Sequence, residues 1–267
     1  MFIDSHCHLD ASEFGDAATQ IAEQARTAGV SWIIVPAVER ANFDKVAKLS
    51  ATLPSCVYAL GIHPLFVPDA AEEDLGVLRE RVQRAINDDH FVAIGEIGLD
   101  FFIPELTAEP MRAKQEFFYS EQLKIARDFD LPVILHVRRS QDTLLKYLRR
   151  IQVKGGIAHA FNGSAQQAQA FIDLGFVLGF GGAMTFTRAL QIRRLATSLP
   201  LSALVLETDA PDISPAWLHP AINSPAQTPL IAAVLAELRG QSLSDIAQQT
   251  TDNVARVLPR LGSLMMA

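Results

Sequence analysis

The sequence is poor in cysteine, with only Cys7 and Cys56 among 267 residues. A lone disulfide is unusual in a chain without an export signal, so we expect both thiols to be reduced. The amino terminus lacks a basic segment followed by an apolar one and begins directly with the strand-like residues Met1-Phe2-Ile3, so we expect no signal peptide. These features predict a cytoplasmic protein.

Long hydrophobic runs are also missing. Apolar runs such as Trp32-Ile33-Ile34-Val35 stop far short of the roughly 20 residues that span a bilayer, so we expect no membrane contact. No low-complexity tract or Gly/Ser linker interrupts the chain, and 49% hydrophobic residues supply a large core. We therefore expect one domain over residues 1–267, with disorder confined to the tail 261–267.

Positive charge is scarce, and the formal net charge is -7. This balance disfavours a surface that coats duplex nucleic acid, because such binding depends on many Lys and Arg contacts to phosphates. It does not exclude a nuclease, because bound divalent cations invert the local potential of an acidic cleft and can attract a phosphate-bearing substrate. No segment indicates an obligate protein partner.

Strand-like and helix-like segments alternate along the chain. Eight short apolar segments are typical of strands: 2–8, 31–36, 56–61, 91–96, 132–136, 156–160, 176–180 and 203–208. Amphipathic segments typical of helices lie between or after them: 16–29, 40–52, 72–89, 109–129, 140–151, 164–174, 188–198, 226–239 and 243–258. This alternation predicts a parallel sheet.

The strand-like segments are almost continuously apolar, which indicates a sheet buried on both faces. Eight parallel strands can close into a (β/α)8 barrel of the TIM type, whose usual size of about 250 residues fits this chain. A doubly wound open sheet is the alternative, but open sheets gather their sites at one switch point. Because the candidate ligands described next belong to five separate strands, we predict the barrel.

Six residues with metal-binding side chains end strand-like segments: His6, His8, Glu96, His136, His159 and Asp209. A β/α barrel builds its active site at the carboxyl ends of its strands. Taken singly, each residue has an ordinary alternative, such as a packed core histidine, a salt-bridged glutamate or a helix-capping aspartate. Together these alternatives require six coincidences at one end of one barrel, so we predict a metal site.

The ligand set predicts two divalent ions. The two imidazoles of His6-Cys7-His8 point to the same side of a strand and can chelate one ion. We expect Glu96 to bridge this ion, which Asp209 also binds, and a second ion held by His136 and His159. Nitrogen-rich sites with shared carboxylates suit zinc or manganese more than calcium, and magnesium is a further candidate.

Two ions roughly 3.5–4 Å apart can clamp the attacking and leaving oxygens of a phosphodiester. We expect a water between them to be the nucleophile, so Glu96 and Asp209 are the candidate catalytic residues. Asp209 is the candidate base, and a role as ligand alone is the alternative.

Three further residues are candidates for substrate contact. His63, in Gly61-Ile62-His63-Pro64, could bind a phosphate or stabilise the leaving group, or it could be a packed histidine held by Pro64. Arg138, with Arg139 beside it, and the helix start at Asn162 are placed to meet phosphate, with solvated charges as the alternative for the arginines. Phe101 and Phe102 could stack on bases or form a small core of their own.

Six motifs follow one another along the chain: Asp4-Ser5-His6-Cys7-His8, Gly61-Ile62-His63-Pro64, Gly95-Glu96-Ile97-Gly98-Leu99-Asp100, Pro132-Val133-Ile134-Leu135-His136, His159-Ala160-Phe161-Asn162-Gly163 and Glu207-Thr208-Asp209-Ala210-Pro211. With these motifs the chain resembles, over nearly its whole length, the TatD family of metal-dependent deoxyribonucleases in the amidohydrolase superfamily. The resemblance implies a TIM-type barrel, two divalent metals on the same six ligands, and 3′ to 5′ exonuclease action on DNA.

We therefore expect a metal-dependent phosphodiesterase, a 3′–5′ exodeoxyribonuclease whose substrate is the end of single-stranded DNA. The alternative is a metal-dependent hydrolase of a small ester, amide or phosphoester. Many dinuclear members of the wider superfamily bridge their metals with a carboxylated lysine, whereas this chain has Glu96 and no lysine near that strand end. A third alternative, a metal-binding scaffold without catalysis, would need a lost ligand, and none is lost.

Overall fold

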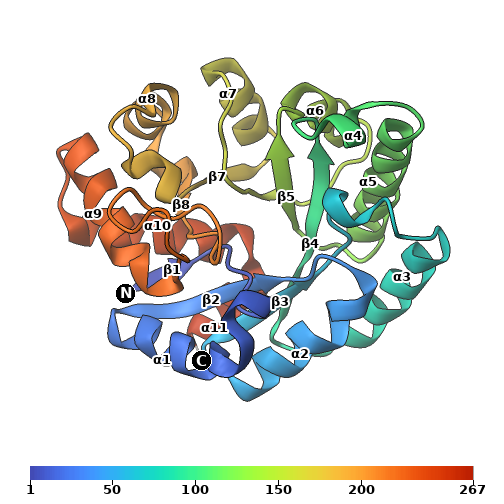
Figure 1. The fold of residues 1–267 in the computed structure, drawn as a ribbon, viewed down its shortest axis with the longest axis horizontal. Helices are drawn as coiled ribbons and strands as arrows, with labels where there is room; N and C mark the ends of the chain where they lie inside the picture. Colours follow the sequence, from blue (N-terminus) through green and yellow to red (C-terminus); the bar gives the residue numbers. More distant parts are fainter. Residues whose placement is uncertain (267) are drawn as a thin grey trace.

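A computed structural model describes residues 1–266 and contains one parallel sheet of eight strands that pair in chain order, β1 to β8. The strands are β1 (Phe2–Asp4), β2 (Val30–Pro36), β3 (Cys56–Leu60), β4 (Phe91–Asp100), β5 (Val133–Arg138), β6 (Gly156–Ala158), β7 (Phe176–Phe180) and β8 (Leu204–Leu206). Helices surround the strands (Figure 1). The predicted (β/α)8 barrel is confirmed.

The helices are α1 (Ala18–Thr27), α2 (Phe43–Thr52), α3 (Glu73–Ala85), α4 (Pro104–Thr107), α5 (Met111–Asp128), α6 (Gln141–Leu148), α7 (Ala165–Asp173), α8 (Leu190–Ser198), α9 (Thr228–Arg239), α10 (Leu243–Val257) and α11 (Pro259–Met266). Nine of the helices fall within the predicted segments, whereas α4 and α11 were not predicted. Short 3-10 turns are η1 (Ser12–Ala17), η2 (Arg40–Asn42), η3 (Pro64–Phe66), η4 (Gly182–Thr185), η5 (Leu201–Ala203) and η6 (Pro225–Gln227). Within the described chain, no helix is both long and apolar enough to cross a bilayer.

The first and last strands of the sheet, β1 and β8, meet at the seam of the barrel. Hydrogen bonds from the backbone and from one side chain join the chain segments there. The Ser5 amide donates to the Leu206 carbonyl at 3.0 Å, and the Asp209 amide donates to the His6 carbonyl at 2.9 Å. Between these two bonds, the buried Asp4 carboxylate accepts hydrogen bonds from the backbone amide and the hydroxyl of Thr208, at 2.9 and 2.5 Å. The seam therefore joins the two chain segments that carry His6 and Asp209.

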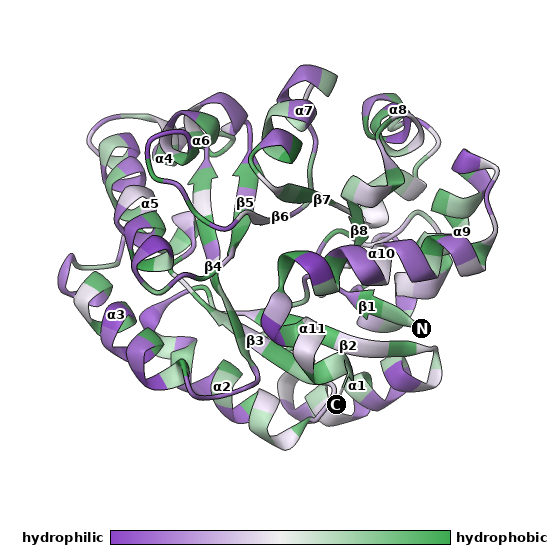
Figure 2. Ribbon diagram, turned by 180° about the vertical axis from the view of Figure 1, so that it is seen from behind, coloured by the Kyte–Doolittle hydropathy of each residue, from purple (hydrophilic) through white to green (hydrophobic). Residues whose placement is uncertain are grey.

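The inside of the barrel is filled by apolar side chains that the strands contribute, and the strands are the most hydrophobic part of the ribbon (Figure 2). Val254 and Val257 of α10, with Leu258 and Leu261, pack against these side chains and close one end of the barrel. The expected disorder of the tail 261–267 is therefore wrong for residues 261–266, because Leu261 is fully buried and α11 continues to Met266. Residue 267 lies outside the described chain.

Several predicted strands are shorter than the apolar segments suggested. β1 ends at Asp4, β6 at Ala158 and β8 at Leu206, so His6, His8, His159 and Asp209 lie in the loops just beyond their strands. His136 lies inside β5 and Glu96 inside β4, which continues to Asp100. The apolar pattern extends past the strand ends because the loops at the barrel mouth are buried as well.

A bulge in β4 places Glu96. The pairing of β4 with β5 shifts between Ile94 and Ile97, so Gly95 and Glu96 leave the regular ladder, and the Glu96 amide donates instead to the Ala37 carbonyl at 2.9 Å. A bulge of this kind re-aims a side chain. Two residues later, Gly98 has φ +148°, and a Cβ there would overlap the His136 carbonyl oxygen.

We predict that Gly98→Ala lowers the free energy of unfolding by about 2–3 kcal/mol, since the new methyl group meets both a strained φ and the β5 backbone. Chemical denaturation measures the change. Gly76→Ala is the matched control, because Gly76 lies within α3 and a Cβ added there would meet no atom within 4 Å beyond its chain neighbours and the backbone of its own helix. This control should be neutral or stabilising by up to about 1 kcal/mol. Equal stability of Gly98→Ala and the wild type would contradict the argument.

Candidate metal centre

Glu96 is the centre of a ring of histidines at the barrel mouth. Its side chain is 1% exposed. Oε2 lies 3.0 Å from His6 Nε2 and 3.4 Å from His8 Nε2. Oε1 lies 3.0 Å from His136 Nδ1 and 3.7 Å from His159 Nε2. The two oxygens thus face two different groups of imidazole nitrogens.

Asp209 completes the group on the Oε2 side. Its Oδ1 lies 3.6 Å from His6 Nε2, 3.7 Å from His8 Nε2 and 3.9 Å from His159 Nε2. The His6 and His8 Nε2 atoms are themselves 3.3 Å apart, so the two side chains share one side although they lie beyond β1. Asp209 has a left-handed backbone with φ +57°, a conformation that costs energy in residues other than glycine and clusters at functional sites.

His63 is buried among the side chains of the cluster, with its side chain 8% exposed. Its Nε2 is 3.0 Å from His136 Nδ1 and 3.4 Å from Glu96 Oε1. Its Nδ1 accepts a hydrogen bond from the Leu65 amide at 3.1 Å, which holds the ring and places the proton of the neutral form on Nε2. His63 therefore joins the histidine group on the Oε1 side.

Two acids behind the ring contact its histidines. Asp100 Oδ2 lies 3.1 Å from His136 Nε2, opposite the nitrogen that faces Glu96. Glu207 Oε1 accepts the Ala160 amide at 2.6 Å and lies 3.3 Å from His159 Nδ1, although this second contact lacks hydrogen-bond alignment. A Cβ at Gly179 would overlap the Glu207 carboxylate, so β7 leaves space for this acid. Such acids orient the ligand rings.

The pKa values follow from burial and from these contacts. Burial, aided by nearby His159, lowers the pKa of His6 well below its usual range. Burial also disfavours charge on His8 and His159, yet the surrounding carboxylates raise their pKa values to about 9 and about 10. For Glu96, burial is outweighed by the neighbouring histidines, which hold its pKa well below the usual range.

For Asp209, burial prevails over the neighbouring histidines and raises its pKa to about 6. Asp100 differs, because the effect of burial is outweighed by His136 and the amides of Phe102 and Ile103, which lower its pKa to about 2. The cluster as a whole attracts positive charge, which protons supply on its histidines and which divalent cations can supply instead.

The donor atoms fit divalent metals. Three overlapping groups each bring three ligand atoms within 4.8 Å of one another: His6, His8 and Asp209; His6, Glu96 and His159; and His63, Glu96 and His136. Imidazole nitrogens and carboxylate oxygens that converge without other hydrogen-bonding groups between them are the donor set of zinc and related transition ions. The six residues predicted as ligands all lie in this cluster, and His63 lies there too.

The other residues predicted to contact substrate lie farther out. Arg138 is 46% exposed, with Nη1 3.6 Å from Asp100 Oδ2. Its guanidinium carbon lies 4.0 Å from the centre of the Phe102 ring, and that of Arg139 lies 4.6 Å from the same centre. Asn162 is exposed in the loop after β6, and its carbonyl accepts a hydrogen bond from Gln141.

Sequence reasoning did not assign roles to Asp100 and Glu207. Both lie in the quoted motifs, Asp100 four residues after Glu96 and Glu207 two residues before Asp209. The position of these two acids, so close in sequence to predicted ligands, was the signal that could have indicated their roles. Their partners, His136 and His159, are distant in the chain, so only the fold shows the contacts.

We predict that Glu207→Ala weakens metal binding about 10–100-fold, since His159 loses the acid beside its Nδ1 and the loop loses the bond to the Ala160 amide. Competition with a chelator of known affinity measures this change. Glu207→Gln keeps an oxygen acceptor for that amide and should fall between the wild type and the alanine variant. If a folded Glu207→Ala protein bound metal with the wild-type affinity, Glu207 would not orient His159.

Comparison with known proteins agrees with the fold and the cluster. A family model described as TatD related DNase matches residues 3–259. An uncharacterized metal-dependent hydrolase of Escherichia coli, YjjV, is 40% identical over 253 residues, which cover 94% of this chain and 95% of that protein. An uncharacterized metal-dependent hydrolase of Haemophilus influenzae is 36% identical over 260 residues, which cover 96% of this chain and 98% of that protein.

The crystal structure of YjjV, a TatD homologue from E. coli, superimposes with a TM-score of 0.91 at 39% identity, covering 97% of this chain and 98% of the other. A TatD family hydrolase from Entamoeba histolytica has the same fold, with a TM-score of 0.83 at 20% identity over 96% of this chain and 97% of that one. The resemblance seen in the motifs is confirmed, and the chain belongs to the TatD family of metal-dependent hydrolases in the amidohydrolase superfamily.

Proposed function

We propose that this hydrolase is a phosphodiesterase with two divalent metals, zinc, manganese or magnesium, and that it removes nucleotides from the 3′ end of single-stranded DNA. The observation that carries the proposal is the division of contacts around Glu96. Oε2 faces His6 and His8, while Oε1 faces His136 and His159. A buried carboxylate with nitrogen donors on both sides suits a bridge between two ions.

The proposed ligand assignment follows this division. One ion would be held by His6, His8, Glu96 and Asp209, and the other by Glu96, His136 and His159. Ions bound there would lower the pKa of water and polarise phosphoryl oxygens, which is the chemistry that phosphodiester hydrolysis needs. The description of the matching family as TatD related DNase supports DNA as the substrate class.

The chain's own residues have separate roles in this proposal. Asp209 has its carboxylate at the open side of the cluster, 14% exposed, where it can take a proton from water. His63 presents its Nε2 proton toward the Oε1 side and can donate to a phosphoryl oxygen. Asp100 and Glu207 hold His136 and His159 in place behind the reacting atoms.

Charge at the rim supports an anionic substrate. Arg138 and Arg139 both lie over the ring of Phe102, which is 45% exposed, so the aromatic face fixes two guanidinium groups beside the mouth. These cations can contact phosphates of the strand next to the scissile one. We include Asn162, on the loop after His159, as a further substrate contact.

The test uses metal-free protein reloaded with magnesium, manganese or zinc, and single-stranded DNA labelled at either its 5′ or its 3′ end. We expect a ladder of 5′-labelled products that requires metal. Asp209→Asn, which keeps an oxygen ligand but loses the base, should lower the rate about 10²–10⁴-fold. Its metal content and circular dichroism serve as controls for an intact site.

Intact DNA under every metal, together with hydrolysis of a simple ester, amide or phosphoester, would replace the nuclease assignment with the small-substrate alternative. Wild-type rates in Asp209→Asn would instead remove Asp209 as the base. A ladder of 3′-labelled products would show that nucleotides are removed from the 5′ end, which would reverse the proposed polarity.

A further inference from the structure

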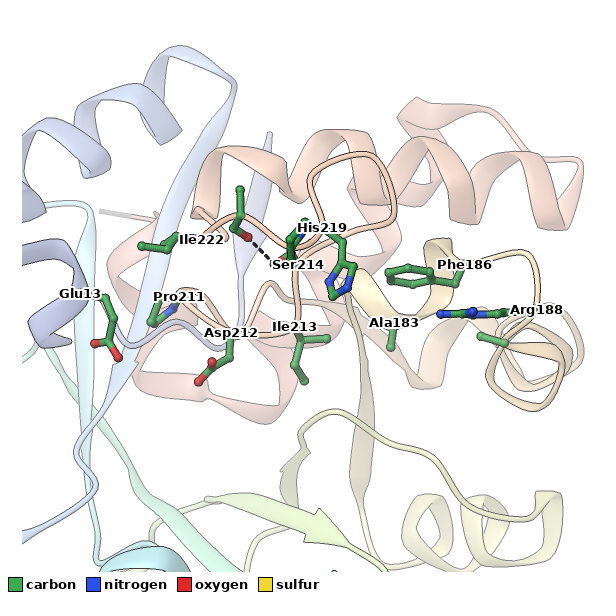
Figure 3. Close-up of a pocket in the computed structure, with 13 residues that line it drawn as sticks. Glu13, Ala183, Phe186, Arg188, Pro211, Asp212, Ile213, Ser214, His219 and Ile222 are labelled. Carbon is green, nitrogen blue, oxygen red and sulfur yellow. Dashed lines mark hydrogen bonds between the residues drawn. The ribbon is translucent and has the colours of Figure 1, made fainter.

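A hollow of about 700 Å³ lies next to the segment that carries Asp209, and Figure 3 shows the side chains that line it. Its walls come from three loops that follow β1, β7 and β8. Its lining includes Glu13, Phe186, Arg188, Asp212, Ile213 and His219. We call this hollow the β8 pocket. Its volume is within the range of about 300–1,000 Å³ that small-molecule sites occupy.

The β8 pocket is joined to the metal centre through the backbone. Asp212 lines the pocket, and its amide donates to the carbonyl of Asp209 at 2.8 Å. Glu13 follows His8 by only five residues. The pocket therefore lies next to the two chain segments that carry His8 and Asp209.

The two ends of the pocket differ in chemistry. Figure 3 shows Glu13 and Asp212 toward one end, with Phe186, His219 and Arg188 toward the other. The rings of Phe186 and His219 meet edge to face, with centroids 5.7 Å apart and planes at 79°. The guanidinium carbon of Arg188 lies 5.8 Å from the centre of the Phe186 ring. The far end is thus aromatic and basic.

Hydrogen bonds fix the walls of the pocket. The buried Asn223 side-chain amide donates to the carbonyls of Thr208 and Asp212, at 2.8 and 2.9 Å. The Thr185 hydroxyl accepts the Ala216 amide at 2.7 Å, which ties the loop after β8 to the loop after β7. A Cβ at Gly182 would overlap the Ile213 carbonyl oxygen, so these two loops also touch directly. The pocket is therefore formed before a ligand binds.

The charges indicate which part of a substrate this pocket suits. The carboxylates of Glu13 and Asp212 lie at the end of the pocket opposite Phe186 (Figure 3). They would repel a phosphate group there, but they can accept hydrogen bonds from hydroxyl or amino groups. Beyond them, the partly exposed Ile213 and the ring of Phe186 offer apolar contact for a flat, uncharged group. Arg188 can stack on such a group or meet a more distant phosphate.

We propose that the β8 pocket binds a nucleobase of the substrate, with the ring packed against Phe186 and His219 and with Arg188 beside it. This inference rests on the proposed phosphodiesterase function and names the group that the enzyme recognises next to the scissile phosphate. Because stacking tolerates every base, the pocket should favour nucleotides over sugar phosphates without selecting one base.

Calorimetry with manganese-loaded protein tests the proposal, with thymidine 5′-monophosphate and 2-deoxyribose 5-phosphate as probes. We expect the nucleotide to bind at least about fivefold more tightly, the lower end of what stacking on one aromatic side chain provides. Phe186→Ala should remove most of this preference. Phe186→Leu keeps apolar bulk without a ring and should lose the preference for the nucleotide too. This variant tests the proposal even if the alanine variant fails to fold.

The matched control is Phe117→Ala, since Phe117 belongs to α5, is 39% exposed and does not line the pocket. It should keep the wild-type preference. Equal affinity of the wild type for both probes, or an unchanged preference in both Phe186 variants, would overturn the proposal. A preference that depends on Phe186 in a protein that cleaves no DNA would leave the ring-binding pocket in place and remove the proposed reaction.

Discussion

The buried negative charge of Glu96 is the constraint on which the barrel mouth depends. A carboxylate in a low-dielectric interior costs several kcal/mol unless other groups compensate it. Here five histidines lie within 3.7 Å of its two oxygens: His6, His8, His63, His136 and His159. Protons on His8 and His159, whose pKa values are raised to about 9 and about 10, can balance this charge, but they place two cationic imidazoles close to the other histidines. Divalent ions satisfy the carboxylate and the nitrogens at the same time.

The rest of the fold holds this arrangement in place. The bulge in β4 aims Glu96 into the mouth, and Gly98 lets β4 approach the β5 backbone beside His136. At the seam, Asp4 links β1 to the segment that carries Asp209. The opposite end of the barrel is closed by α10 and α11, whose apolar side chains complete the inner core. The polar groups are thereby confined to one end, where the loops after the strands are free to bind a substrate.

Much of this could be predicted from the sequence because the relevant signals are local. Apolar segments separated by amphipathic segments define the strands and helices, and residues such as His136 and His159 appear at or beside the strand ends. Strand ends were less predictable, because the buried loops after β1, β6 and β8 continue the apolar pattern. The role of α11 was missed, because burial of Leu261 depends on contacts with strands far away in the chain. The depth of His63 and the β8 pocket also arise from contacts between distant segments.

The most direct measurement of the central claim is anomalous diffraction from crystals of manganese- or zinc-loaded protein. We predict two ions, one on each side of Glu96. The first should contact Oε2 together with His6, His8 and Asp209, and the second should contact Oε1 together with His136 and His159. A single ion, or two ions that do not share Glu96, would contradict the assignment of this carboxylate as the bridge.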